Sequence, residues 1–146
     1  AMKVVLDTNV LISGIGRSGG PPGRIVDAWL AGKFDLLTSE ALIDELVVAL
    51  TYPKVRKLLR GAGVLDQDLR DYVEILRFKA IVVRPVAIQL RMTPADPKDV
   101  PVLEALLASG AEFLVTGDKK HLLSLGMSQI VTAADFATRL KAFDAA

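Results

Sequence analysis

The stretch Val4-Val5-Leu6-Asp7 is a short, fully apolar run that ends in an acid. Continuous apolar runs of this length are typical of strands in a parallel sheet that is covered on both faces. Similar runs follow at residues 34–37, 80–83, 113–115 and 129–131. Helical stretches lie between these runs, so strands and helices alternate along the chain. The pattern predicts an α/β fold, a three-layer α/β/α sandwich with a parallel central sheet of about five strands.

Helices are predicted between the strands from the spacing of apolar residues and from capping and breaking residues. They cover residues 10–15, 24–31, 39–50, 53–59, 66–76, 96–107, 121–125 and 134–142. The stretch from Gly14 to Gly23 is rich in glycine and proline, and we expect it to form a loop between the first two helices. No internal repeat or low-complexity tract occurs, so we expect a single domain spanning residues 2–142.

The composition excludes several classes of protein. The 146 residues are 51% hydrophobic and 24% charged, and none is cysteine. This apolar content with nearly balanced charge allows a buried core and excludes disorder. A disulfide scaffold and a thiolate zinc site are impossible without cysteine. The apolar runs are too short for a membrane span, and an acid at position 7 comes too early for a signal peptide, so we expect a soluble cytoplasmic protein.

The charges are distributed unevenly, although 18 basic and 17 acidic residues give a net charge of only +1. Residues 51–91 hold nine Lys and Arg against four acids, so that segment carries +5 and the remainder −4. Its helical part, at about residues 51–79, could contact the phosphates of a nucleic acid or bury a second subunit. A solvated helix face is the alternative interpretation.

Acidic residues lie near the ends of the predicted strands. Asp7 follows the first strand, and Asp118 follows the fourth by two residues. Asp96 and Asp99 open the helix before the fourth strand, and Glu45 lies in the helix after the second. Sites in open parallel sheets form beyond the carboxyl ends of the strands, where clustered carboxylates need cations. Oxygen ligands without cysteine favour Mg²⁺ or Mn²⁺ over zinc, and such ions can promote phosphoryl displacement.

Each acid also has a purely structural interpretation. Asp7 could cap a turn, and Asp118 could cap the helix that follows it. Asp96 could be the N-cap of a helix with Asp99 near its third position, where the helix dipole favours negative charge. Periodicity is silent about Glu45, because it and the preceding acid flank the apolar stripe about symmetrically. Composition and spacing alone therefore leave the metal site and the structural roles open.

Four motifs resemble those of PIN-domain ribonucleases. They are Val5-Leu6-Asp7-Thr8-Asn9-Val10-Leu11-Ile12-Ser13-Gly14, Ser39-Glu40-Ala41-Leu42-Ile43-Asp44-Glu45-Leu46, Asp96-Pro97-Lys98-Asp99 and Thr116-Gly117-Asp118. The resemblance follows the family's order and approximate spacing over nearly the whole chain, from Val4 to about Leu125. The third and fourth motifs are similar to those of the VapC-like branch, the toxins of toxin–antitoxin pairs. Any one motif is weak, but four in order are specific.

The resemblance implies a metal-dependent endoribonuclease that acts on single-stranded RNA. The residues that would hold Mg²⁺ or Mn²⁺ are Asp7, Glu45, Asp99 and Asp118, with Asp96 as an auxiliary acid. Small polar residues could orient these carboxylates or their waters: Thr8, Asn9, Ser13 and Thr116. For Thr8 and Ser13, a hydrogen bond at a helix start is the favoured interpretation. His121 is interpreted as a solvated helix residue rather than a general base.

The resemblance also implies partners, an antitoxin protein and a second copy in a homodimer. The loop at residues 16–23 is longer than in compact toxins, which leaves the shape of the substrate entrance open. One alternative hypothesis is a non-catalytic module that binds RNA or an antitoxin. Another is phosphoryl transfer through an aspartyl-phosphate, which we rank lower because it usually requires an acid where this chain has Asn9.

Overall fold

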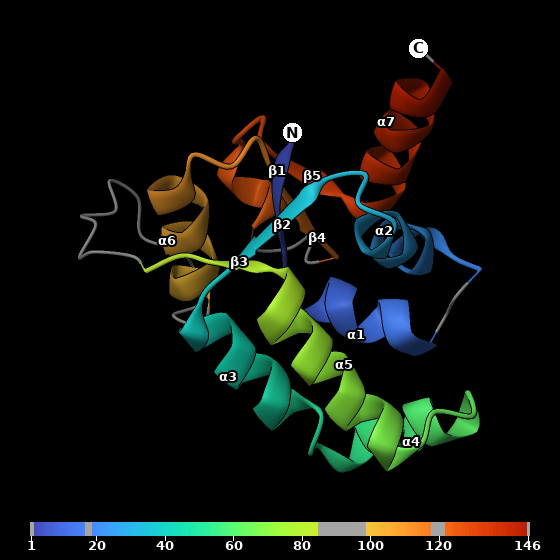
Figure 1. The fold of residues 1–146 in the computed structure, drawn as a ribbon. Coiled ribbons are helices and arrows are strands. Elements are labelled where there is room, and N and C mark those ends of the chain that lie inside the picture. Colours follow the sequence, from blue (N-terminus) through green and yellow to red (C-terminus); the bar gives the residue numbers. More distant parts are fainter. Residues whose placement is uncertain (1, 17–18, 85–98, 118–121, 146) are drawn as a thin grey trace.

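The computed structural model describes residues 2–16, 19–84, 99–117 and 122–145 (Figure 1). At its centre is a five-stranded sheet in the order β3-β2-β1-β4-β5, in which all neighbouring strands are parallel. The strands are β1 Lys3–Leu6, β2 Asp35–Thr38, β3 Ile81–Val82, β4 Phe113–Thr116 and β5 Ile130–Thr132. Each predicted strand is present, and its ends differ by at most one residue from the prediction.

Helices connect the strands and form the outer layers of the sandwich. They are α1 Thr8–Gly16, α2 Pro21–Leu30, α3 Glu40–Ala49, α4 Pro53–Gly61, α5 Asp66–Lys79, α6 Val100–Ser109 and α7 Ala133–Ala145, with a short 3-10 helix at Leu123–Leu125. In Figure 1, α6 covers one face of the sheet, and α2 and α7 cover the other. The pair α4 and α5 extends away from the sheet together with α3. No helix in the described residues is long and apolar enough to cross a membrane.

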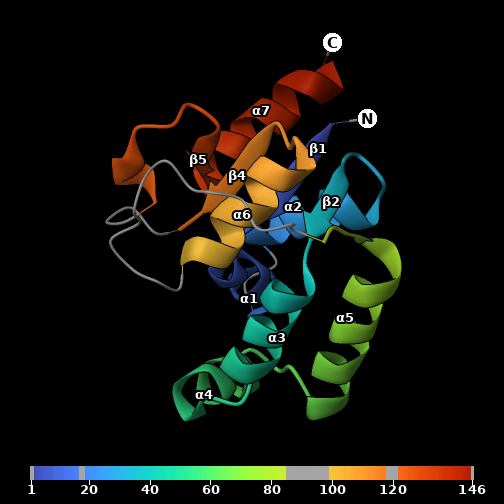
Figure 2. The same cartoon turned by 90° about the vertical axis from the view of Figure 1, so that its left-hand side faces the viewer.

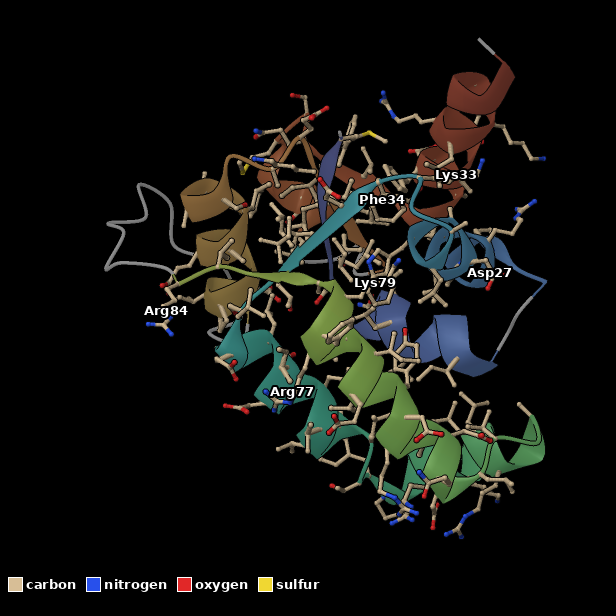
Figure 3. The ribbon with its side chains drawn as sticks, in the orientation of Figure 1. Asp27, Lys33, Phe34, Arg77, Lys79 and Arg84 are labelled. Carbon is tan, nitrogen blue, oxygen red and sulfur yellow. The ribbon has the colours of Figure 1, made fainter. Side chains whose placement is uncertain are left out.

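Side chains of β1 divide the core into two parts because successive residues of a strand point to opposite faces. Val4 and Leu6 belong to the larger cluster, with residues of α1, α2, α5 and α7. Val5 belongs to the other cluster, with residues of α6. Phe34 packs in the larger cluster with its ring 5.5 Å from that of Phe136 (Figure 3). The two clusters confirm the three-layer sandwich and explain why the strands are apolar without alternation.

The predicted loop from Gly14 to Gly23 is wrong at both ends. Helix α1 continues to Gly16 and α2 starts at Pro21, so only residues 17–20 separate the two helices. Proline suits the start of α2 because the first residues of a helix need no N–H partner within it. Gly14 allows close packing rather than a turn, since a Cβ there would lie 2.5 Å from Cγ2 of Val26. The stretch at 16–23 is therefore not a long loop.

Candidate active site at the carboxyl edge of the sheet

Asp7 lies directly after β1, at the carboxyl edge of the sheet. Its backbone N–H donates to the carbonyl of Val115 in β4 over 2.9 Å. Its own carbonyl accepts hydrogen bonds from the N–H groups of Val10 and Leu11 at the start of α1. Asp7 is therefore the last residue bonded to the sheet and the first residue bonded to the helix. Its side chain is half-buried in this strand-to-helix turn.

Donors from two separate parts of the chain hold the Asp7 carboxylate. The backbone N–H of Thr8 donates to Oδ1 over 2.8 Å. The hydroxyl of Thr116, at the end of β4 and 0% exposed, donates to Oδ2 over 2.8 Å. The Nδ2 group of Asn9 makes a longer contact of 3.4 Å with the same oxygen. Hydrogen bonds of this kind fix the orientation of a carboxylate.

Asn9 also reaches the backbone that leads to Asp118. Its Oδ1 accepts a hydrogen bond from the N–H of Gly117 over 3.1 Å, across 108 positions of sequence. Reasoning from residue types missed Gly117 because its contribution comes from the backbone. In the sequence, the only indication that Gly117 contributes to the site was its place between Thr116 and Asp118 in the fourth motif. We call the hydrogen-bonded set of Asp7, Thr8, Asn9, Thr116 and Gly117 the Asp7 network.

Two of the predicted orienting residues behave differently from each other. Thr8 fits the helix-start interpretation, but it acts through its backbone N–H and is itself buried. Ser13 lies more than one turn inside α1, so a hydrogen bond at a helix start is wrong for it. Neither hydroxyl makes a side-chain hydrogen bond with another residue in the described part of the chain.

Glu45 is distinguished from Asp44 by burial. Helix α3 begins directly after β2, where the hydroxyl of Ser39 accepts a hydrogen bond from the N–H of Leu42 over 3.3 Å. Along this helix Glu45 is half-buried, whereas Asp44 is exposed. Helix α3 packs against both α1 and α6. The half-buried acid therefore lies on a helix that contacts the elements next to Asp7 and Asp99.

Asp99 is buried, with 9% of its surface exposed. It occupies the N-cap position of α6, but its side chain makes no capping hydrogen bond. Its backbone angles are helical, so Asp99 lies in a turn of helix that precedes Val100. The prediction that Asp99 lies near the third position of a helix that begins at Asp96 depends on residues outside the described part of the chain. Pro101 fits the first turn of α6, where its missing N–H costs no hydrogen bond.

The elements next to these three acids lie near the carboxyl edge of the sheet. In Figure 2, α1, α3 and the start of α6 lie below the strands, and α4 lies further from the sheet. Asp96, Asp118 and His121 lie outside the described residues. Within residues 2–16, 19–84, 99–117 and 122–145, no three His, Asp or Glu side chains form a group that could hold a metal ion. Carboxylate oxygens are the ligands that a hard divalent cation prefers.

The basic segment forms the helices α4 and α5. Helix α4 contains Lys54, Arg56, Lys57 and Arg60 and no acid. Arg56 pairs with Asp66 over 2.9 Å, and both side chains are partly exposed. The hydrogen bond and charge of this arginine lower the pKa of Asp66 below its ordinary value of 3.8. Part of the positive charge is thus balanced by a local acid at the surface.

Two side-chain hydrogen bonds join α5 to α3 and α1. Arg77 donates to Glu40 at the start of α3 over 3.1 Å, and Figure 3 shows Arg77 beside that helix. The hydroxyl of Tyr72 donates to the carbonyl of Leu11 in α1 over 3.2 Å, and burial raises the pKa of this tyrosine. These bonds place α5 next to the helix that follows Asp7.

Three comparisons with known proteins agree with this architecture. An uncharacterized protein of Methanocaldococcus jannaschii, MJ1680, is 40% identical over 124 residues, which are 85% of this chain and 75% of that protein. The crystal structure of VapBC2 from Rickettsia felis, bound to a DNA fragment from its promoter, has the same fold. It matches with a TM-score of 0.55 and 13% identity, covering 90% of this chain and 97% of that chain. The family model of the PIN domain matches residues 3–120, so this chain belongs to the PIN-domain family.

Proposed function

We propose that this protein is a metal-dependent endoribonuclease that hydrolyses the phosphodiester bonds of single-stranded RNA. The observation that carries the proposal is the Asp7 network, in which a half-buried carboxylate at the end of a central strand is held by donors from β4 and α1. A structural cap would not require a buried threonine from another strand. PIN domains are generally nucleases, and the family match includes all four acidic motifs.

The proposed metal ligands are Asp7, Glu45, Asp99 and Asp118, with Asp96 in an auxiliary role. A bound Mg²⁺ or Mn²⁺ ion would offset the charge of the phosphate and promote attack by water. Hydrogen bonds from neighbouring residues fix the position of the Asp7 carboxylate. Thr116 and Asn9 hold Oδ2 of Asp7, and the backbone N–H of Thr8 holds Oδ1, so the carboxylate is oriented before substrate binds.

We further propose that the chain is the toxin of a toxin–antitoxin pair and that it forms a homodimer. The motif resemblance to VapC-like toxins supports an antitoxin partner, and the VapBC2 complex has the same fold. Exposed apolar side chains on α4, on α5 and at the N-cap of α5 support a protein partner, since large exposed hydrophobic groups often mark contact surfaces. They include Leu58 at 51%, Leu65 at 67% and Phe78 at 94% exposure. Light scattering of the purified chain would measure the homodimer, and mass spectrometry of proteins that co-purify with the chain from its native host would test for an antitoxin.

The substitution Asp7→Asn tests the enzymatic proposal. We expect it to abolish Mn²⁺-dependent cleavage of single-stranded RNA while the circular dichroism spectrum stays that of the wild type. Asp44→Asn is the matched control, because it removes an exposed acid from α3. Full activity in Asp7→Asn would contradict the proposal. Stoichiometric binding of RNA or an antitoxin by the wild type, with no cleavage under any divalent metal, would indicate the non-catalytic module.

A further inference from the structure

A pocket of about 240 Å³ lies beside the Asp7 network. Its wall comes from α1, the first turn of α2, the end of β4 and the start of α7, through the residues Asn9, Val10, Ser13, Pro22, Gly117 and Ala133. Asn9 and Gly117 are also members of the Asp7 network. The pocket and the proposed catalytic carboxylate therefore share a wall at the carboxyl edge of the sheet.

The size of the pocket suits one small ring system. Pockets for drug-sized ligands occupy roughly 300–1,000 Å³, and this one is smaller at about 240 Å³. A peptide or several nucleotides would therefore not fit inside it. A single planar group inserted from a longer molecule would fit, with the rest of that molecule lying along the surface.

The lining of the pocket favours an uncharged occupant. None of the six residues that the structure describes along its wall carries a charge. Helix α2 begins beside it with Pro21 and Pro22, which have no backbone N–H groups to donate. The usual ability of a helix start to bind phosphate is therefore weakened here. The apolar and uncharged polar residues described along this wall suit a neutral ring.

Two side chains supply hydrogen-bonding groups to an otherwise apolar wall. The amide of Asn9 uses Oδ1 for Gly117 and one N–H for Asp7, which leaves its second N–H for a ligand. Ser13 lies four residues further along α1, on the same face of the helix, and its hydroxyl can donate and accept. Val10 and Ala133 provide apolar surface between these groups.

We propose that this pocket is a nucleobase subsite, which binds an unstacked base of the RNA next to the scissile phosphodiester. The inference rests on the proposed ribonuclease function and adds to it a source of sequence preference. Single-stranded RNA presents bases with apolar faces and edges that donate and accept hydrogen bonds, matching this lining. A site that hydrogen-bonds one base rejects a base that leaves its polar groups unpaired.

The test is to sequence the cleavage products of a random RNA pool. We expect the wild type to prefer one base at a fixed position relative to the cut. Ser13→Leu should fill the pocket, remove that preference and lower kcat/KM on the preferred sequence by about 10- to 100-fold. Ser13→Ala keeps the volume and should weaken the preference less. Ser128→Leu is the matched control, because Ser128 is exposed in a turn before β5, at the opposite edge of the sheet.

A binding measurement separates failure of this inference from failure of the ribonuclease proposal. In NMR spectra of the wild type, we expect one of the four nucleosides to shift the backbone N–H signals of Ser13 and Gly117. RNA cleavage with an unchanged preference in both Ser13 variants, and no nucleoside shift at these signals, would overturn the subsite alone. Absence of RNA cleavage together with nucleoside shifts would overturn the ribonuclease and support the subsite. If Ser13→Leu does not fold, Ser13→Ala and the nucleoside shifts decide the question.

Discussion

The Asp7 network and the surface of α4 and α5 use polar side chains in opposite ways. In the network, Thr116 is 0% exposed and bonds Asp7 from 109 positions away. On α4 and α5, most polar groups bond near neighbours at exposed positions, as in the pair of Arg56 and Asp66, ten positions apart. The exceptions are Tyr72 and Arg77, which bond Leu11 and Glu40. Exposed local pairs contribute little to stability. Long-range bonds to a half-buried carboxylate instead fix its position, which is the property that a catalytic site requires.

The largest expected effect is the loss of RNA cleavage on substitution of Glu45, which is compared with its neighbour Asp44 on α3. Glu45→Gln should lower Mn²⁺-dependent RNA cleavage by more than the roughly 100-fold that loss of an outer partner can cost at a metal site. Asp44→Asn should keep wild-type activity, because this acid is exposed. Steady-state kinetics over a series of Mn²⁺ concentrations measure both variants. Equal activity of the two variants would show that the burial of Glu45 does not identify it as a metal ligand.

The second largest effect is expected for Thr116 of the Asp7 network, which is compared with the exposed Thr51 in the turn before α4. Thr116→Val removes the hydroxyl that holds Asp7 and should reduce cleavage about 10- to 100-fold, with a higher Mn²⁺ concentration at half-maximal activity. Thr51→Val removes an exposed hydroxyl that bonds the carbonyl of Val48, and should leave both quantities unchanged. A purely structural role for Thr116 would lower the melting temperature without changing the Mn²⁺ dependence. That result would contradict the orienting role of Thr116.

The strands were predictable from sequence because a parallel strand buried on both faces is a continuous apolar run. Periodicity could not choose between Asp44 and Glu45, since both flank the same stripe. The resemblance selected Glu45, and in the structure Glu45 is half-buried whereas Asp44 is exposed. The bond between Asn9 and Gly117 depends on the register of β1 with β4, which no local pattern encodes. The sequence thus named Asn9 and Thr116 as orienting residues, but not the atoms through which they contact Asp7 and Gly117.

The third effect concerns stability at the junction of α1 and α2. Gly14→Ala would place a methyl group 2.5 Å from Cγ2 of Val26 and 3.1 Å from the carbonyl oxygen of Pro22. We expect a loss of about 1–3 kcal/mol in the free energy of unfolding, as for other overpacked positions. Gly19→Ala is the control, because a Cβ there meets nothing within 4 Å. Urea denaturation measures both, and equal midpoints would show that Gly14 is not required for this packing.

The smallest effect tests the surface pair of Arg56 and Asp66. This arginine lowers the pKa of Asp66 below 3.8, so the pair stabilises the folded state at pH values above that figure. The stabilisation should disappear as the pH falls through the lowered pKa and the carboxyl gains a proton. A double-mutant cycle with Arg56→Gln and Asp66→Asn isolates the pair from the favourable position of Asp66 at the start of α5.

Melting temperatures of the four proteins in this cycle should give a small coupling at pH 7 that decreases as the pH is lowered below 3.8. The coupling should also decrease in 1 M salt, since exposed charges are screened. RNA cleavage should be the same in all four proteins. A coupling that changes with neither pH nor salt would mean that packing, rather than charge, joins these two side chains. A change in RNA cleavage would instead show that the functional surface reaches from the Asp7 network to the start of α5.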